Sequence, residues 1–233
     1  MKVLRLLTLI IVLLTVLTAA PGVSAHRPVW GEGQLLEIEN LTTSFAFYRE
    51  LTSSSQVDVY AFEARAGEHL HAGINIPAIS ELESYGVSVA LLGPGLPEAD
   101  YTLLPADHPE GLGAIVAPSA PGEDFFEPFT QTNYWGRQRL DLSLPETGTY
   151  YLAIWNPDGA TGKYVLDTGT VEVFSPLDLF GFPLWWVQVH LFFGHAPQMT
   201  AALVAVFMAI GAVAAIRRVH RLGRLRVTVG DVQ

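Results

Sequence analysis

The sequence predicts an all-β fold: an extracytoplasmic jelly-roll or β-sandwich domain followed by a single C-terminal transmembrane helix. Short segments of alternating apolar and polar residues, separated by turns rich in Gly and Pro, indicate β-sheets. Two long apolar runs, one near each end of the sequence, indicate targeting and membrane segments. The expected divisions are a signal peptide (1–25), the β-sandwich (26–175), an aromatic juxtamembrane segment (176–197), a transmembrane helix (198–216) and a basic cytoplasmic tail (217–233).

The first 25 residues have the three parts of a secretory signal peptide. Lys2 and Arg5 supply positive charge, residues 6–17 are apolar, and residues 23–25 read Val-Ser-Ala, the compact residues that a signal peptidase recognises. Cleavage there makes His26 the first residue of the mature protein. An uncleaved N-terminal anchor is the alternative interpretation.

The first strands of the domain are predicted from alternation. Residues 57–64 alternate and run into a turn at 65–68. Residues 69–76 alternate again, with the apolar even-numbered residues on one face. The opposite face then carries His69, His71, Gly73 and Asn75. Further strand candidates upstream are residues 34–40 and 45–50.

The remaining strands are bounded by turn residues. We expect strands at 87–92, 139–144, 150–155 and 163–168, with the strongest turn at Asn156-Pro-Asp-Gly159. The stretch 94–138 is rich in Pro and Gly and is expected to be mostly loop. Many short strands without a strong helical period favour a sandwich or jelly roll.

Residues 199–216 are uncharged and nearly long enough, at about 1.5 Å per residue, to cross a hydrocarbon core of about 30 Å. Five arginines follow, beginning with Arg217, Arg218 and Arg221, and aromatic residues precede the run. This is the positive-inside arrangement with a cytoplasmic C-terminus, which a buried core helix would not explain. Small residues repeat every fourth position within the run and allow a homodimer through this helix.

Charge is distributed unevenly along the chain. Residues 26–197 hold 22 acidic and 6 basic residues, whereas residues 217–233 hold five arginines and a single Asp. An acidic ectodomain argues against nucleic acid as a ligand, while the basic tail suits anionic lipid. The absence of cysteine excludes thiol catalysis and zinc–thiolate sites.

Two stretches carry a resemblance to a known family. Residues 57–68, VDVYAFEARAGE, contain a D-x-Y-x-F strand that runs into a turn. Residues 144–154, LPETGTYYLAI, are followed by GKYVL at 162–166. These motifs resemble the bacterial pre-peptidase C-terminal domain family. The resemblance implies a small jelly-roll β-sandwich of the kind that serves exported proteins as a non-catalytic aid to binding, folding or secretion; the long 94–138 stretch departs from its pattern.

Three histidines form a candidate metal site. A histidine at the amino terminus offers both its amine and its imidazole, and a strand histidine would complete a three-nitrogen set suited to copper. His26 with His69 or His71 has these groups, and the arrangement resembles the histidine brace of copper-dependent monooxygenases and copper carriers. The alternative is that all three are ordinary surface histidines.

Residues 123–135 are unusually aromatic and acidic for a loop. The aromatics fold back to close the open end of the sandwich, which the cost of an exposed apolar patch favours, or they form a binding platform for a glycan or a partner chain. The candidate binding residues are Phe125, Phe126, Phe129, Tyr134 and Trp135.

The sequence therefore predicts a non-catalytic, membrane-anchored extracytoplasmic binding or accessory module rather than an enzyme. The alternative is an extracytoplasmic copper-binding or metal-handling protein that uses an N-terminal histidine. Expected partners are membrane lipid, through residues 198–216 and the arginines that follow, and an unidentified envelope protein or glycan. No cofactor is expected apart from copper under the alternative.

Overall fold

The computed structural model describes residues 26–98, 100, 102, 104–105, 112–128, 130–175, 178–197, 199–201, 204 and 208. The chain divides into two compact units, Met1–Trp186 and Val187–Gln233. The predicted signal peptide, the basic tail and most of the predicted transmembrane helix lie outside the described residues. Within the part that is described, no helix has the length and apolar character needed to cross a membrane.

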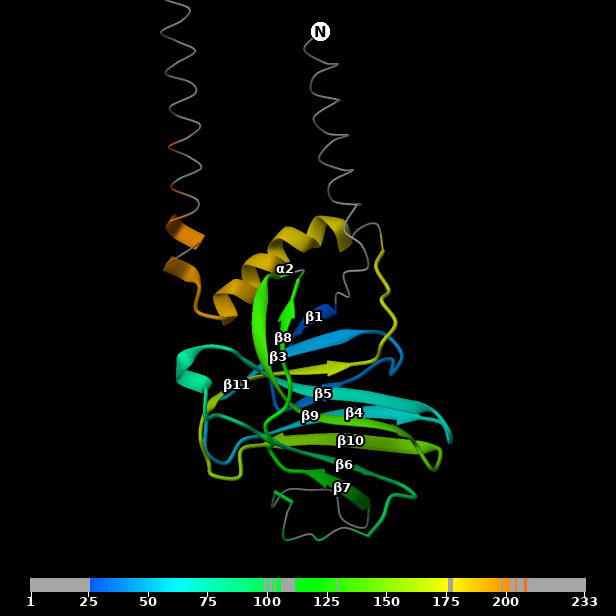
Figure 1. Cartoon of the computed structure of the whole chain (residues 1–233). Helices are drawn as coiled ribbons and strands as arrows, with labels where there is room; N and C mark the ends of the chain where they lie inside the picture. Colours follow the sequence, from blue (N-terminus) through cyan, green and yellow to red (C-terminus); the bar gives the residue numbers. More distant parts are fainter. Residues whose placement is uncertain are drawn as a thin grey trace, which may run out of the picture. The chain divides into compact units, whose positions relative to one another are not determined.

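The described residues of the first unit contain two β-sheets (Figure 1). The six-stranded sheet has the order β1 (Arg27–Trp30), β3 (Phe45–Leu51), β11 (Gly162–Thr168), β5 (His69–Pro77), β9 (Thr132–Ser143) and β8 (Asp124–Glu127). The five-stranded sheet has the order β2 (Leu35–Glu37), β4 (Val57–Ala64), β10 (Gly148–Trp155), β6 (Ser88–Gly93) and β7 (Gly113–Ala117). A short 3-10 helix, η1 (Ser80–Leu82), lies between β5 and β6 in the chain, and α2 (Asp178–Phe192) follows β11.

Strand pairing is antiparallel except at the N-terminal edges. β1 runs parallel to β3, and β2 runs parallel to β4. The central pairs are long and regular, such as β10 with β4, which stay in register from Gly148 opposite Ala64 to Trp155 opposite Val57. The two-sheet architecture confirms the predicted β-sandwich.

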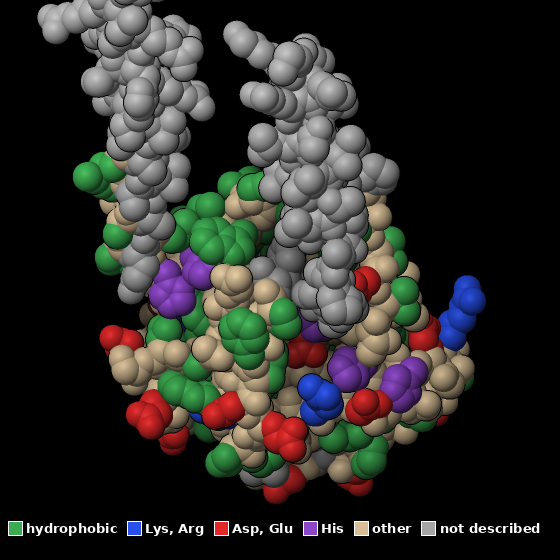
Figure 2. Space-filling view, turned by 45° about the horizontal axis from the view of Figure 1, so that its top comes forward, with side chains coloured by type: hydrophobic (Ala, Val, Ile, Leu, Met, Phe, Trp, Pro, Cys, Tyr) green, Lys and Arg blue, Asp and Glu red, His purple; other side chains and the backbone are tan. Residues whose placement is uncertain are grey.

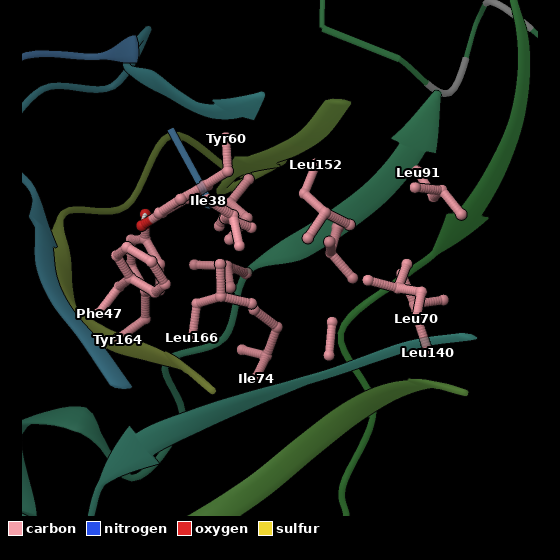
Figure 3. Close-up of a cluster of buried hydrophobic side chains, with 14 of the residues drawn as sticks. Ile38, Phe47, Tyr60, Leu70, Ile74, Leu91, Leu140, Leu152, Tyr164 and Leu166 are labelled. Atoms are coloured by element: carbon pink, nitrogen blue, oxygen red, sulfur yellow. Dashed lines mark hydrogen bonds between the residues drawn. The ribbon is translucent and has the colours of Figure 1, made fainter. Parts of the chain in front are cut away.

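The core lies between the sheets and is built from buried side chains of both. On β5, Leu70, Ala72, Ile74 and Ile76 are buried in it, as the alternation predicts. Figure 3 shows Phe47, Leu152 and Leu166 from other strands in the same cluster. Burying each large apolar side chain contributes about 1.5–3 kcal/mol, so this layer is the main source of stability.

One ion pair lies inside the core. Asp58 on β4 is fully buried, and its Oδ2 accepts a hydrogen bond from Nε of Arg49 on β3 at 3.0 Å. The Tyr164 hydroxyl donates to the same Oδ2 at 2.7 Å, and Tyr60 contacts the Tyr164 hydroxyl at 2.9 Å. Arg49 also donates to the backbone carbonyls of Gly31 and Gly33, and so fastens the β1–β2 connection to the core.

The expectation of a mostly loop segment at 94–138 was wrong for three parts of it. β7 and β8 form within this stretch, and β9 begins at Thr132 rather than at 139. β8 pairs with β9 through residues 132–135, so the aromatic segment is a β-hairpin at the edge of the six-stranded sheet. The short strand β1 was also missed.

Candidate functional site

The outer face of the six-stranded sheet, which points away from the core, is hollowed. We call this hollow the outer-face cavity; its volume is about 250 Å³. Histidine, arginine and acidic side chains gather on this face (Figure 2). Its lining residues are His26, Ser44, His71, Asn75, Phe125, Arg139, Asp167, Gly169 and Thr170.

Small residues at aligned positions produce the hollow. Strand register places Ala46, Asp167, Gly73 and Arg139 in one row across β3, β11, β5 and β9. A Cβ atom on Gly73 would lie only 2.5 Å from Oδ1 of Asp167, so the carboxylate leans over the glycine. A glycine inside a strand often marks such a close approach. Gly73, which has no side chain, thus leaves open space between the acidic side chain of Asp167 and the basic side chain of Arg139.

Asp167 is the most deeply placed charge of the cavity. It is 5% exposed, and its Oδ1 accepts a hydrogen bond from Nδ2 of Asn75. Its Oδ2 lies 3.8 Å from Nε2 of His71, which is too long for a hydrogen bond. Among the described residues, no Lys or Arg lies within 4.0 Å of this carboxylate. A buried carboxylate with so little compensation favours a cationic group beside it.

A second carboxylate joins the two histidines of β5. Asp141 on β9 accepts from Nε2 of His69 at 2.5 Å and from Nδ1 of His71 at 3.2 Å. Hydrogen bonds from His69 and then His71 lower the pKa of Asp141 below its ordinary value. This pairing fixes the ring of His71, whose Nε2 then points toward Asp167.

The aromatic residues form a wall at one side of the cavity. Phe125 on β8 lines it, is 41% exposed and stacks on Tyr134 with ring centroids 5.1 Å apart. Tyr134 is 3% exposed and its hydroxyl contacts the Tyr48 hydroxyl at 3.1 Å; burial raises the pKa of Tyr134 to about 12. Trp30 stacks on Tyr48 in turn, with centroids 4.6 Å apart.

The five predicted aromatic residues therefore divide between different surroundings. Phe125 lines the cavity, and the ring of Tyr134 stacks against the ring of Phe125 without lining the cavity itself. Phe126 is 54% exposed, whereas Trp135 packs against the core and carries Arg137 over its ring at 5.8 Å. Phe129 lies outside the described residues.

The predicted histidines are partly brought together. His26 and His71 line the same cavity, and His69 lies next to His71 through Asp141 but does not line it. Nδ1 of His26 is hydrogen-bonded to the Ser44 hydroxyl. Across the described part of the chain, no three His, Cys, Asp or Glu side chains are grouped so as to hold a metal ion. Copper binding stays a prediction, and it depends on the amine of His26 as a third nitrogen.

Six cavity residues were not singled out as candidates from the sequence: Ser44, Asn75, Arg139, Asp167, Gly169 and Thr170. Asn75, Arg139 and Asp167 come from β5, β9 and β11, which are distant in the chain and meet only through cross-strand register. Ser44 lies just before β3, and Gly169 and Thr170 follow β11. The one local signal is Gly73, an isolated glycine in the middle of a strongly alternating strand.

A second, larger cavity of about 640 Å³ lies on the outer face of the five-stranded sheet. Trp155, Val57 and Val116 line it together with Ser, Thr, Asn, Gln and Pro residues. Every described residue that lines it is uncharged. The outer-face cavity on the six-stranded sheet is the better candidate site, because the buried carboxylate of Asp167 and the oppositely charged Arg139 both line it.

Comparisons with known proteins give partial likenesses of fold. No protein-family model matches the chain, and no curated protein matches its sequence. The periplasmic g-type lysozyme inhibitor PliG of Salmonella Typhimurium is 17% identical, with a TM-score of 0.34, over 59% of this chain and 98% of that chain. A surface-associated copper-binding protein, CorA of Methylomicrobium album BG8, is 9% identical, with a TM-score of 0.32, over 62% and 100%. The pre-peptidase C-terminal domain of Bacillus anthracis collagenase is 14% identical, with a TM-score of 0.32, over 58% and 95%, and it belongs to the family that the sequence motifs resemble.

Proposed function

We propose that this chain is a non-catalytic binding module, exported and held at the outer side of a membrane, whose ligand occupies the outer-face cavity. The observation that carries the proposal is Asp167, a buried carboxylate that opens into a cavity and lacks a strong cationic partner among the described residues. Asn75, His71, Arg139 and Ser44 surround it with further recognition groups.

Export and anchoring rest on the two apolar runs of the sequence and on the charge asymmetry between residues 26–197 and 217–233. The test is to express the full chain in a bacterium and determine the N-terminal residue of the product by mass spectrometry. Protease added to intact spheroplasts should remove the sandwich and leave a fragment that contains the arginine tail. A product that retains residues 1–25, or a sandwich that is protected from protease, would contradict this part.

Ligand binding at the cavity is tested by blocking its mouth. Thr170 is exposed and lines the cavity, whereas Thr161 is exposed at the other end of β11 and does not line it. The full chain in detergent micelles is screened by ligand-observed NMR against small cations, anions, zwitterions and neutral polyols. Thr170→Trp should abolish the signals that the wild type gives, and Thr161→Trp should keep them. Equal signals from the two variants would place the binding elsewhere.

A second candidate function, copper handling, is favoured by His26 and His71 lining one cavity. The amine and Nδ1 of an N-terminal His26 would chelate copper once Nδ1 turns away from Ser44, and His71 would supply the third nitrogen. Calorimetric titration with Cu(II) should give one site in the mature chain, which is lost in His26→Ala and in His71→Ala. His69→Ala is the matched control and should keep the site, because His69 does not line the cavity. If the mature chain gives no binding signal on titration with Cu(II), copper handling is ruled out.

A further inference from the structure

We propose that the ligand of the outer-face cavity is a small zwitterionic α-amino acid with an apolar side chain. The proposal rests on the proposed function and specifies the chemical class that the cavity binds. Asp167 takes the ammonium group, Arg139 takes the carboxylate, and Phe125 borders the side chain. The three parts of this assignment follow from different observations.

The ammonium position is given by acceptor atoms that the fold leaves available. Oδ1 of Asp167 accepts from Asn75, while Oδ2 has no hydrogen-bond donor among the described residues. Nδ2 of Asn75 is used in that contact, and its Oδ1 accepts no hydrogen bond from any residue described. Two nearby oxygen acceptors, one of them charged, suit an ammonium group, which donates up to three hydrogen bonds. Burial of Asp167 strengthens this charge-assisted contact because the local dielectric constant is low.

The carboxylate position is given by Arg139. It stands in the same strand row as Asp167, two strand spacings away across Gly73, so their Cα atoms are about 10 Å apart. Arg139 is exposed, and it forms no ion pair within the described residues. A guanidinium group binds a carboxylate through two parallel hydrogen bonds. Because Asp167 and Arg139 line one cavity and do not pair with each other, a ligand carrying both charges satisfies both residues.

Ligands with a single charge fit less well. A simple anion would approach the buried carboxylate of Asp167 and be repelled, while a simple cation would leave Arg139 without a partner. The apolar part of the ligand is assigned from Phe125, whose ring is 41% exposed and lines the cavity. A volume of about 250 Å³ suits a small ligand rather than a glycan chain.

The test uses three probes that share one apolar group. L-leucine carries both charges, 3-methylbutylamine lacks its carboxylate, and 4-methylpentanoate lacks its amine. Each is titrated by calorimetry into the full chain in detergent micelles. We expect L-leucine to bind, and each singly charged probe to bind at least tenfold more weakly.

Two variants and one control locate the contacts. Asp167→Asn and Arg139→Gln should each weaken L-leucine at least tenfold, and Arg139→Gln should leave the affinity for 3-methylbutylamine unchanged. Arg137→Gln is the matched control, since Arg137 lies over Trp135 outside the cavity, and it should bind L-leucine like the wild type. Arg139 is exposed, so its variant stays informative even if Asp167→Asn fails to fold.

The outcomes separate this proposal from the proposed function. L-leucine and 3-methylbutylamine binding equally well would show that Arg139 is not used, and would overturn the zwitterion assignment. The zwitterion assignment would also be overturned if none of the three probes binds. The binding function would still stand if other fragments give NMR signals with the wild type that Thr170→Trp abolishes. Failure of every fragment class would remove the proposed function itself.

Discussion

Replacing the buried Arg49 should lower the free energy of unfolding of the sandwich by several kcal/mol, about 3–5. In Arg49→Met the stem is replaced by an apolar side chain of similar length, but the carboxylate of Asp58 stays at 0% exposure without its cation. Breaking a buried ion pair by removing one partner costs about 3–5 kcal/mol. The carbonyl groups of Gly31 and Gly33 also lose the donors that Arg49 supplies.

The assay is thermal unfolding of the full chain in micelles, monitored by near-ultraviolet circular dichroism. For a domain of about 150 residues, a loss of about 3–5 kcal/mol lowers the melting temperature by roughly 6–20 °C. The double variant Arg49→Met/Asp58→Leu should recover part of this loss, because no unpaired charge is then buried. A loss below about 1 kcal/mol in Arg49→Met would refute the buried-pair reasoning, because that is the range of an exposed pair.

Three further predictions concern the outer face. Gly73→Ala places a Cβ atom 2.5 Å from Oδ1 of Asp167. The substitution should lower the free energy of unfolding by about 1–3 kcal/mol in thermal unfolding and should abolish L-leucine binding. Unchanged L-leucine binding would contradict the role of Gly73 in making room for the cavity. Burial raises the pKa of Tyr134 to about 12, so its contribution to stability is complete below about pH 10 and is lost as the pH rises toward 12. Tyrosine ionisation, followed by ultraviolet absorbance, should therefore coincide with alkaline unfolding, and ionisation of all tyrosines in folded protein near pH 10 would rule this out. The lowered pKa of Asp141 stabilises the fold above the ordinary carboxyl range, and this stabilisation shrinks as the pH falls below that range. Asp141→Asn should therefore lower the melting temperature at pH 7 and lower it progressively less in acid. An effect that does not change with pH would show that the histidine contacts of Asp141 are not the cause.

The sequence predicts strands that either alternate between apolar and polar residues or form a short apolar run bounded by turn residues. Residues 57–64 match β4 from end to end, and β5 was placed to within about one residue, because both strands alternate. The turn residues that bound β6, β10 and β11 placed those strands to within about two residues. β8 was missed because its residues are mostly exposed on both faces, so apolar and polar side chains do not alternate. β1 has only four residues and contains a proline.

The site was predictable only in part for a related reason. His71 and Phe125 were named from local patterns, and both line the cavity. Asp167, Asn75 and Arg139 are ordinary polar residues on the outer faces of their strands, and only the register of β11, β5 and β9 aligns them. Register is decided by the whole sheet, so short sequence patterns do not reveal it.

The order of strands in the sheets also determines which strand pairs can form early in folding and which must form late. β3 and β4, near the N-terminus, obtain their main partners from β11 and β10, and the buried contact of Asp58 joins residues 106 positions apart. Strands this distant in sequence pair late and slowly, because the entropy cost of closing the long intervening loop comes before the stabilising contacts form. The N-terminal half therefore waits with its apolar strand faces uncovered until β10 and β11 have been synthesised. A premature stop before Gly162 would leave the central position of the six-stranded sheet empty, and such a fragment should require a chaperone or be degraded rather than accumulate.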